Sequence, residues 1–180
     1  LKLVPLSEIE NLPRDAGKVK GRALTVERFD RKRDGGRIHM EDFAQVFGVF
    51  ADDKYEKRSY ASIAQVLSAE AGDEAVMDFV RRLVFSILIG NADMHLKNWS
   101  LLYRDGRKPT LAPAYDYAST VPYIPGDRLA LGLGGSKQLD SITQDQIRRF
   151  ADTARLAVSP LWRLVQETIE KTIEAWKVLE

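Results

Sequence analysis

One long helical pattern over residues 73–89 constrains the fold more than any other feature of this sequence. Its apolar residues recur at i, i+3, i+4 and i+7, as an amphipathic helix requires. They are Val76, Phe79, Val80, Leu83, Val84, Ile87 and Leu88. Gly72 stops the preceding segment, and Asp73 is placed to cap this one. Other elements have to cover such a wide apolar face, so we expect this helix to be the central buried one.

Shorter patterns on both sides of this helix predict an α+β fold, because strands come first, helices dominate later and a hairpin interrupts them. The predicted strands and extended segments are 3–6, 22–29, 37–40, 99–103, 110–112 and 129–133. The other predicted helices are 41–50, 59–71, 144–156 and 159–179. Thr143 and Gln146 form a capping box for one of them, and Ser159-Pro160 opens the last. Asp34-Gly35-Gly36 predicts a turn that leads back into the strand at 37–40.

Composition narrows the classes of function. Of the 180 residues, 44% are apolar and 29% charged, which is typical of one globular domain or one lobe of a larger protein. The absence of cysteine excludes disulfides, thiolate zinc sites, iron–sulfur clusters and a cysteine nucleophile. A net charge of +1 argues against a general nucleic-acid binder. No apolar run is long enough to span a membrane and no signal peptide is visible, so we expect a cytoplasmic protein without a membrane partner.

The segment at 90–98 is the most informative for chemistry, because it sets Asn, Asp, His and Lys side chains between an apolar helix and an apolar strand. Buried polar groups are costly unless they are partnered, so such a cluster needs a reason. Asp93 and Asn98 have the D-x-x-x-x-N spacing of a kinase catalytic loop. There the Asp accepts the proton of the attacking hydroxyl. The Asn offers its carbonyl oxygen to Mg²⁺, which prefers oxygen ligands.

A second acidic residue should follow a hairpin in such an enzyme, to bind the metal that bridges the phosphates. Asp116 follows the predicted hairpin, in Ala114-Tyr115-Asp116-Tyr117. The alternative interpretations are structural: Asp93, Asn91 and Asp116 as turn residues, and His95 as a buried histidine with a satisfied partner. The conjunction of apolar helix, D-x-H-x-x-N loop, hairpin and aspartate favours phosphoryl transfer.

Three stretches of the sequence resemble HipA-like proteins, which are bacterial serine/threonine kinases and toxins of toxin–antitoxin pairs. They are Ile87–Leu102 (ILIGNADMHLKNWSLL), Leu111–Thr120 (LAPAYDYAST) and Thr25–Arg31 (TVERFDR). The N-A-D-M-H-L-K-N and P-A-Y-D segments are the most specific of the shared motifs. The resemblance implies a mostly helical kinase C-lobe that uses ATP and Mg²⁺. It also implies a protein substrate, a HipB-like antitoxin as partner, and DNA reached only through that antitoxin.

The resemblance assigns roles to individual positions. Asp93 matches the catalytic aspartate, and Asn98 and Asp116 match the Mg²⁺ ligands. His95 lies in the catalytic loop, where it would contact phosphate or hold the loop. Residues 26–30 match the hinge between the kinase lobes.

At the hinge, the backbone carbonyl of Glu27 and the N–H of Phe29 would bind the adenine edge, and Asp30 would lie near the ribose. The alternative for residues 25–29 is a plain half-buried strand. Backbone recognition leaves little side-chain signature, so the sequence does not separate the two.

The resemblance also divides the chain, with the last N-lobe strands and the hinge at 1–40 and the helical C-lobe at 41–180. A kinase needs a loop over the phosphates and a lysine on an N-lobe strand, and neither is recognised here. The chain also begins with Leu1 and not Met, so we expect an upstream part. We therefore expect these 180 residues alone to be inactive and to bind Mg-ATP weakly.

Three other functions remain open from the sequence. Aminoglycoside and choline kinases also use D-x-H-x-x-N, so a small-molecule phosphotransferase is the first alternative. A non-catalytic lobe that binds an antitoxin or nucleic acid is the second, with the basic stretch Arg28–Arg37 as its best feature. A metal-dependent hydrolase that uses Asp93, His95 and Asp116 is the third.

Overall fold

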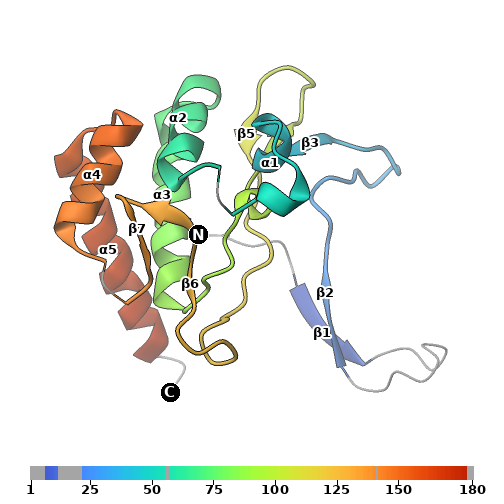
Figure 1. The fold of residues 1–180 in the computed structure, drawn as a ribbon. Coiled ribbons are helices and arrows are strands. Elements are labelled where there is room, and N and C mark those ends of the chain that lie inside the picture. The colour runs from blue at the N-terminus through green and yellow to red at the C-terminus, as the bar shows by residue number, and fades with distance from the viewer. Residues whose placement is uncertain (1–6, 12–21, 56, 141, 178–180) are drawn as a thin grey trace.

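The computed structural model describes residues 7–11, 22–55, 57–140 and 142–177. The extended segment predicted at 3–6 and the last residues of the helix predicted to reach 179 lie outside this range. Most of the helices lie on one side of the molecule together with one small antiparallel sheet, and the other two antiparallel sheets lie on the opposite side (Figure 1). This arrangement confirms the predicted α+β class.

The helices are α1 (Phe43–Val46), α2 (Tyr60–Glu70), α3 (Asp73–Leu88), α4 (Gln144–Ala154) and α5 (Val158–Lys177). Short 3₁₀ turns span Ala51–Asp53 and Leu96–Asn98. The strands are β1 (Ser7–Asn11), β2 (Arg22–Val26), β3 (His39–Asp42), β4 (Ser100–Tyr103), β5 (Thr110–Leu111), β6 (Arg128–Leu133) and β7 (Ser136–Gln138). None of the helices in the described part of the chain is both long and apolar enough to cross a membrane.

The helix predicted at 73–89 is α3, and it is the central one. It packs against α2 on one side and α5 on the other (Figure 1). Phe79 of α3 is fully buried and meets the Trp99 ring edge-on, with 4.6 Å between the ring centroids. The core thus ties α3 directly to the residue that precedes β4.

Several predicted boundaries were wrong, and turn geometry explains most of them. Of the helix predicted at 41–50, only the residues of α1 are helical. Glu41 and Asp42 belong to β3, and Gly48 takes a φ of 61° that ends the turn after α1. The helix predicted to Leu156 ends at Ala154, where Arg155 adopts a left-handed φ of 58°. Gly72, and not Asp73, is the N-cap of α3.

The last helix starts one residue earlier than predicted, at Val158, so Ser159 and Pro160 lie inside its first turn. Proline is tolerated there because N–H groups of the first turn have no intrahelical acceptor. The capping box of Thr143 and Gln146 at the start of α4 is confirmed.

The strand pairing also differs from the sequence expectation. The strand predicted at 22–29 ends at Val26 and pairs with β1, a strand that was not predicted. Asp34-Gly35-Gly36 does form a turn, closed by an isolated bridge between Arg31 and Arg37. The strand that follows it, however, pairs with β4 and not with β2. β4 is distant from β3 in the sequence, and no local pattern predicts that the two strands pair.

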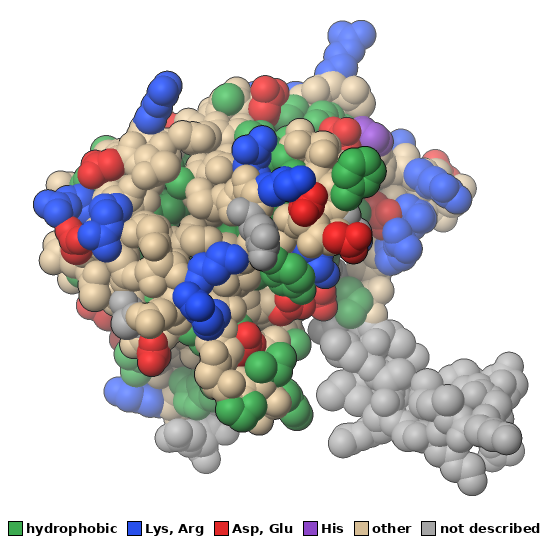
Figure 2. All heavy atoms as spheres, in the orientation of Figure 1, with side chains coloured by type: hydrophobic (Ala, Val, Ile, Leu, Met, Phe, Trp, Pro, Cys, Tyr) green, Lys and Arg blue, Asp and Glu red, His purple; other side chains and the backbone are tan. Residues whose placement is uncertain are grey.

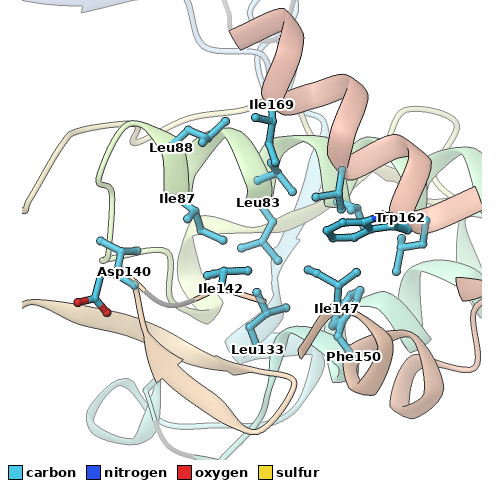
Figure 3. A pocket seen from close by; sticks show the side chains of 15 residues that line it. Leu83, Ile87, Leu88, Leu133, Asp140, Ile142, Ile147, Phe150, Trp162 and Ile169 are labelled. Carbon is cyan, nitrogen blue, oxygen red and sulfur yellow. The ribbon is translucent and has the colours of Figure 1, made fainter. Parts of the chain in front are cut away.

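An apolar cavity of ≈ 250 Å³ lies where α3, α4 and α5 meet β6. Figure 3 shows Leu83 and Ile87 facing Trp162 and Ile169 across it. Of the described residues that line it, Asp140 alone is charged, and its carboxylate lies at the border. The core is therefore incompletely filled at this point.

Candidate active site

The start of the loop after α3 is held by backbone hydrogen bonds. Asn91 N donates to Ser86 O at 2.8 Å, which folds the chain back on the helix end. Gly90 has a φ of 69°, and its carbonyl accepts Thr120 N at 2.9 Å. A Cβ on Gly90 would lie 3.2 Å from Val121 Cγ2, so the residue has to be small as well as left-handed. The loop at 90–95 is thereby fixed against the segment around Thr120.

Asn91 has a structural role in this loop, in agreement with its interpretation as a turn residue. Its side chain is buried, and Asn91 Oδ1 accepts the backbone N–H of Asp93 at 3.2 Å. The Asn91 amide also donates to Asp116 O at 3.5 Å. One side chain therefore connects the backbones that carry the two predicted functional aspartates.

Asn98 and Asp116 meet directly, because Asn98 Nδ2 donates to Asp116 Oδ2 at 3.0 Å. Asn98 belongs to the 3₁₀ turn that leads into β4, and Asp116 follows β5, so the hairpin brings the two together. Asp116 has a φ of 59°, a left-handed conformation that Asp and Asn adopt more readily than other non-glycine residues. This strained backbone aims an exposed carboxylate at the buried Asn98 amide.

Asp93 is held by a residue that the sequence did not single out for the site. Tyr55 OH donates to Asp93 Oδ1 at 2.9 Å across 38 residues of chain. Burial, together with this hydrogen bond and the charge of Asp93, raises the pKa of Tyr55 to about 12. The phenol therefore remains a donor at neutral pH. The sequence Lys54-Tyr55-Glu56 also resembles HipA-like proteins, and this resemblance is the signal that could have pointed to Tyr55.

His95 packs against Tyr55, the residue that holds Asp93. Its ring meets the Tyr55 ring edge-on at 5.2 Å, and its Nδ1 is buried without a hydrogen-bond partner among the described residues. Burial lowers the pKa of His95 below its ordinary value, and the Lys54 charge lowers it further. The charges of Asp93 and Asp116 act in the opposite direction, so both carboxylates lie close enough to influence one imidazole.

Asn98 and Asp116 fit a magnesium ion that is shared with a phosphate ligand. Mg²⁺ usually takes one or two carboxylates from a protein and completes its shell with water and substrate phosphates. Asn98 Oδ1 and Asp116 Oδ1 accept no hydrogen bond from the described residues, so both oxygens are available. Across the same residues, no group of three or more His, Cys, Asp or Glu side chains is arranged to hold a metal. The predicted hydrolase set of Asp93, His95 and Asp116 is thus not a ready-made three-ligand site.

The predicted hinge residues follow the end of β2 and approach the site at one point. The Phe29 ring lies 5.7 Å from the ring of Tyr115, the neighbour of Asp116. The Asp30 carboxylate is occupied by Arg28, whose Nη2 lies 2.7 Å from Asp30 Oδ2, and by Arg31. These contacts hold the Asp30 pKa below its usual range, with the Arg28 hydrogen bond as the largest cause. Glu27 is exposed.

Known proteins resemble the chain over nearly its whole length. Residues 4–176 match the family of HipA-like C-terminal domains. The chain is 47% identical over 178 residues to the Sinorhizobium fredii protein named "Putative kinase Y4dM", which covers 98% of this chain and 43% of that protein. It is 30% identical over 171 residues to the Shewanella oneidensis serine/threonine-protein kinase toxin HipA, which covers 81% of this chain and 39% of that one.

Among solved structures, the fold matches a chain from the Shewanella oneidensis complex of HipA, HipB and operator DNA. The TM-score is 0.72 at 24% identity, and the match covers 94% of this chain and 45% of that chain. The chain therefore spans less than half the length of each of these relatives.

Proposed function

Because the chain belongs to the family of HipA-like C-terminal domains, as its motifs predicted, we propose that it carries the catalytic and metal-binding half of a serine/threonine protein kinase. The reaction is transfer of the γ-phosphate of ATP to a protein hydroxyl. The observation that supports this most is the hydrogen bond between Asn98 and Asp116, the two residues that follow Asp93 at kinase-like spacing. The Asn91 side chain connects the backbones of Asp93 and Asp116, so the three residues belong to one hydrogen-bonded region.

Each residue has a defined task in the proposed reaction. Asp93 accepts the proton of the attacking hydroxyl, and Tyr55 OH orients its carboxylate through Oδ1. Asn98 and Asp116 hold Mg²⁺, which neutralises charge on the phosphates when it is bound. His95 packs under Tyr55 and keeps the catalytic loop in place. Glu27 and Phe29 bind the adenine edge through their backbone, and Asp30 lies near the ribose.

The partners follow from the relatives. One relative is named a HipA toxin, and the matched structure is a complex of HipA with HipB and operator DNA. We propose a HipB-like antitoxin as the partner of this chain, contact with DNA through that antitoxin, and action in the cytoplasm.

The metal role is tested by Asp116→Asn in the natural protein that carries this chain. Asn tolerates the left-handed φ of Asp116, so the substitution removes charge and leaves the backbone in place. We expect Mg-ATP binding, measured by calorimetry, to weaken at least about tenfold, and excess Mn²⁺ to restore part of it. Asp140→Asn, at the border of the apolar cavity, is the matched control and should bind Mg-ATP like the parent. Unchanged, Mg²⁺-dependent binding by Asp116→Asn would refute the metal assignment.

A further inference from the structure

A second cavity, of ≈ 580 Å³, opens beside Asp93. Its walls come from the loop before α2, the catalytic loop, the β5–β6 loop and strands β6 and β7. Tyr55, Asp93, Ile124, Asp127, Arg128 and Lys137 are among the residues that line it. Neither Asn98 nor Asp116 does, so the cavity reaches Asp93 but not the proposed metal ligands. Its volume falls within the roughly 300–1,000 Å³ that is usual for ligand sites.

The polar wall of the cavity is fixed by its own hydrogen bonds. Thr120 Oγ1 accepts the N–H of Ala92 at 3.1 Å and donates to Asp127 Oδ2 at 2.6 Å. Lys137 Nζ donates to Tyr55 O at 2.7 Å and so supports the residue that holds Asp93. A site with such preformed walls loses little entropy when a ligand enters it.

Ile124 lines the cavity, and we call it the rim together with its exposed apolar loop neighbours Val121 and Tyr123. Val121 is 42% exposed, Ile124 52% and Tyr123 84%, and all three lie in the β5–β6 loop. Figure 2 shows hydrophobic side chains gathered at the lower edge of this face, where Figure 1 places that loop. Exposed apolar groups beside a preformed polar cavity mark a place where another molecule binds.

Charge within the cavity is balanced. Two carboxylates, Asp93 and Asp127, face two cations, Arg128 and Lys137, and Lys137 is already engaged by Tyr55 O. Net attraction for an acidic or a basic ligand is therefore small. Because charge discriminates little, the apolar rim is the feature that discriminates between ligands.

We propose that this cavity and its rim receive the acceptor chain: an extended serine or threonine segment whose bulky apolar neighbour packs on Tyr123 and Ile124. This inference rests on the proposed kinase function. The acceptor hydroxyl enters from the cavity side and gives its proton to Asp93 Oδ2, since Tyr55 occupies Oδ1. A bond forms between the hydroxyl oxygen and the γ-phosphorus as the bond to the β-phosphate oxygen breaks. The electron pair of that bond leaves with ADP.

The test is transfer of labelled γ-phosphate to a positional-scanning library of serine and threonine peptides by the natural protein that carries this chain. We expect the strongest labelling where a large apolar residue is fixed next to the hydroxyl. The double variant Tyr123→Ser with Ile124→Ser should flatten this preference and raise the peptide KM at least about tenfold, with the ATP KM unchanged. Trp176→Ser, at an exposed aromatic residue near the end of α5, is the control and should keep the preference.

The outcomes separate this inference from the kinase assignment. Labelling without an apolar preference, or a preference that the double variant retains, would overturn the acceptor site. So would the absence of peptide labelling in a protein whose Mg-ATP binding still depends on Asp116. Loss of that Mg-ATP dependence would instead refute the proposed function itself.

Discussion

The apolar cavity at α3, α4 and α5 and the polar cavity beside Asp93 differ in what their walls can do. The cavity at α3, α4 and α5 is walled by hydrocarbon, with Asp140 at its border. The cavity beside Asp93 is more than twice as large, and aspartates, cations and a phenol converge on it. The first is a packing gap within the core. The second has charged groups in fixed positions, which is what chemistry on a bound molecule requires.

This difference distinguishes the residues that stabilise the fold from the residues that are suited to function. Residues around the apolar cavity stabilise the helices through buried area and have no polar partner to orient. Residues around Asp93 are more exposed and contribute less buried area, but the hydrogen bonds between them hold their side chains in place. Changes in the first region should alter the free energy of unfolding, and changes in the second should alter the rate of phosphate transfer.

The largest expected effect is the loss of transfer in Asp93→Asn. Asn has nearly the same shape but is a far weaker base, so the rate should fall about a hundredfold to ten-thousandfold. Phosphate transfer to protein and thermal melting are measured for this variant and for Asp140→Asn. The control should match the parent in both. Full activity in Asp93→Asn would exclude Asp93 as the base, and a much lower melting temperature would make it a structural residue.

The apolar region is tested by Leu83→Ala. Leu83 is buried in α3 and lines the cavity, so truncation enlarges a gap that is already present. We expect a loss of about 2–5 kcal/mol in the free energy of unfolding, measured with urea. Leu88→Ala lies on the same helix and the same cavity but is 41% exposed, and it should cost far less. Equal costs for the two would show that burial does not control stability here.

A smaller effect is expected from Tyr55→Phe, which removes one hydrogen bond to Asp93. A hydrogen bond to a charged acceptor contributes about 1.5–3 kcal/mol, so kcat should fall roughly tenfold to a hundredfold. The ring remains to pack on His95, and melting should change little. Phe50→Leu, at another exposed aromatic residue, serves as the control. A change in the KM for ATP without a change in kcat would contradict a role for Tyr55 in positioning Asp93.

The smallest effect concerns pH and His95. Burial holds its pKa in the folded protein below the ordinary 6.5, so above that pH it is neutral in both states and contributes no pH dependence. As the pH falls below 6.5, the unfolded chain takes up a proton that the folded protein resists, and the free energy of unfolding decreases. His95→Gln should therefore lose less stability on acidification than the parent. Identical slopes for His95→Gln and the parent would refute the assignment.

Local patterns in the sequence were sufficient for much of this fold. The apolar periodicity of α3, the capping box at Thr143 and the hairpin between residues 99 and 112 depend on near neighbours, and each was predicted in place. The spacing of Asp93, Asn98 and Asp116 was also local, because one loop and one hairpin bring them together. Asn98 and Asp116 do meet in the structure, whereas the shared site with Asp93 and the chemical roles of all three stay predictions.

Tertiary structure alone decided the parts of the site that come from distant segments. The Tyr55–Asp93 hydrogen bond joins residues 38 apart, and Lys137 reaches Tyr55 across 82. The pairing of β3 with β4 and the cavity beside Asp93 likewise require several elements to pack together first. A side chain's own sequence neighbours determine its helix or strand preference, whereas its partner across a cavity depends on how the whole core is filled. For this reason the polar loop at 90–98 could be recognised in the sequence, whereas the surroundings of Asp93 could not.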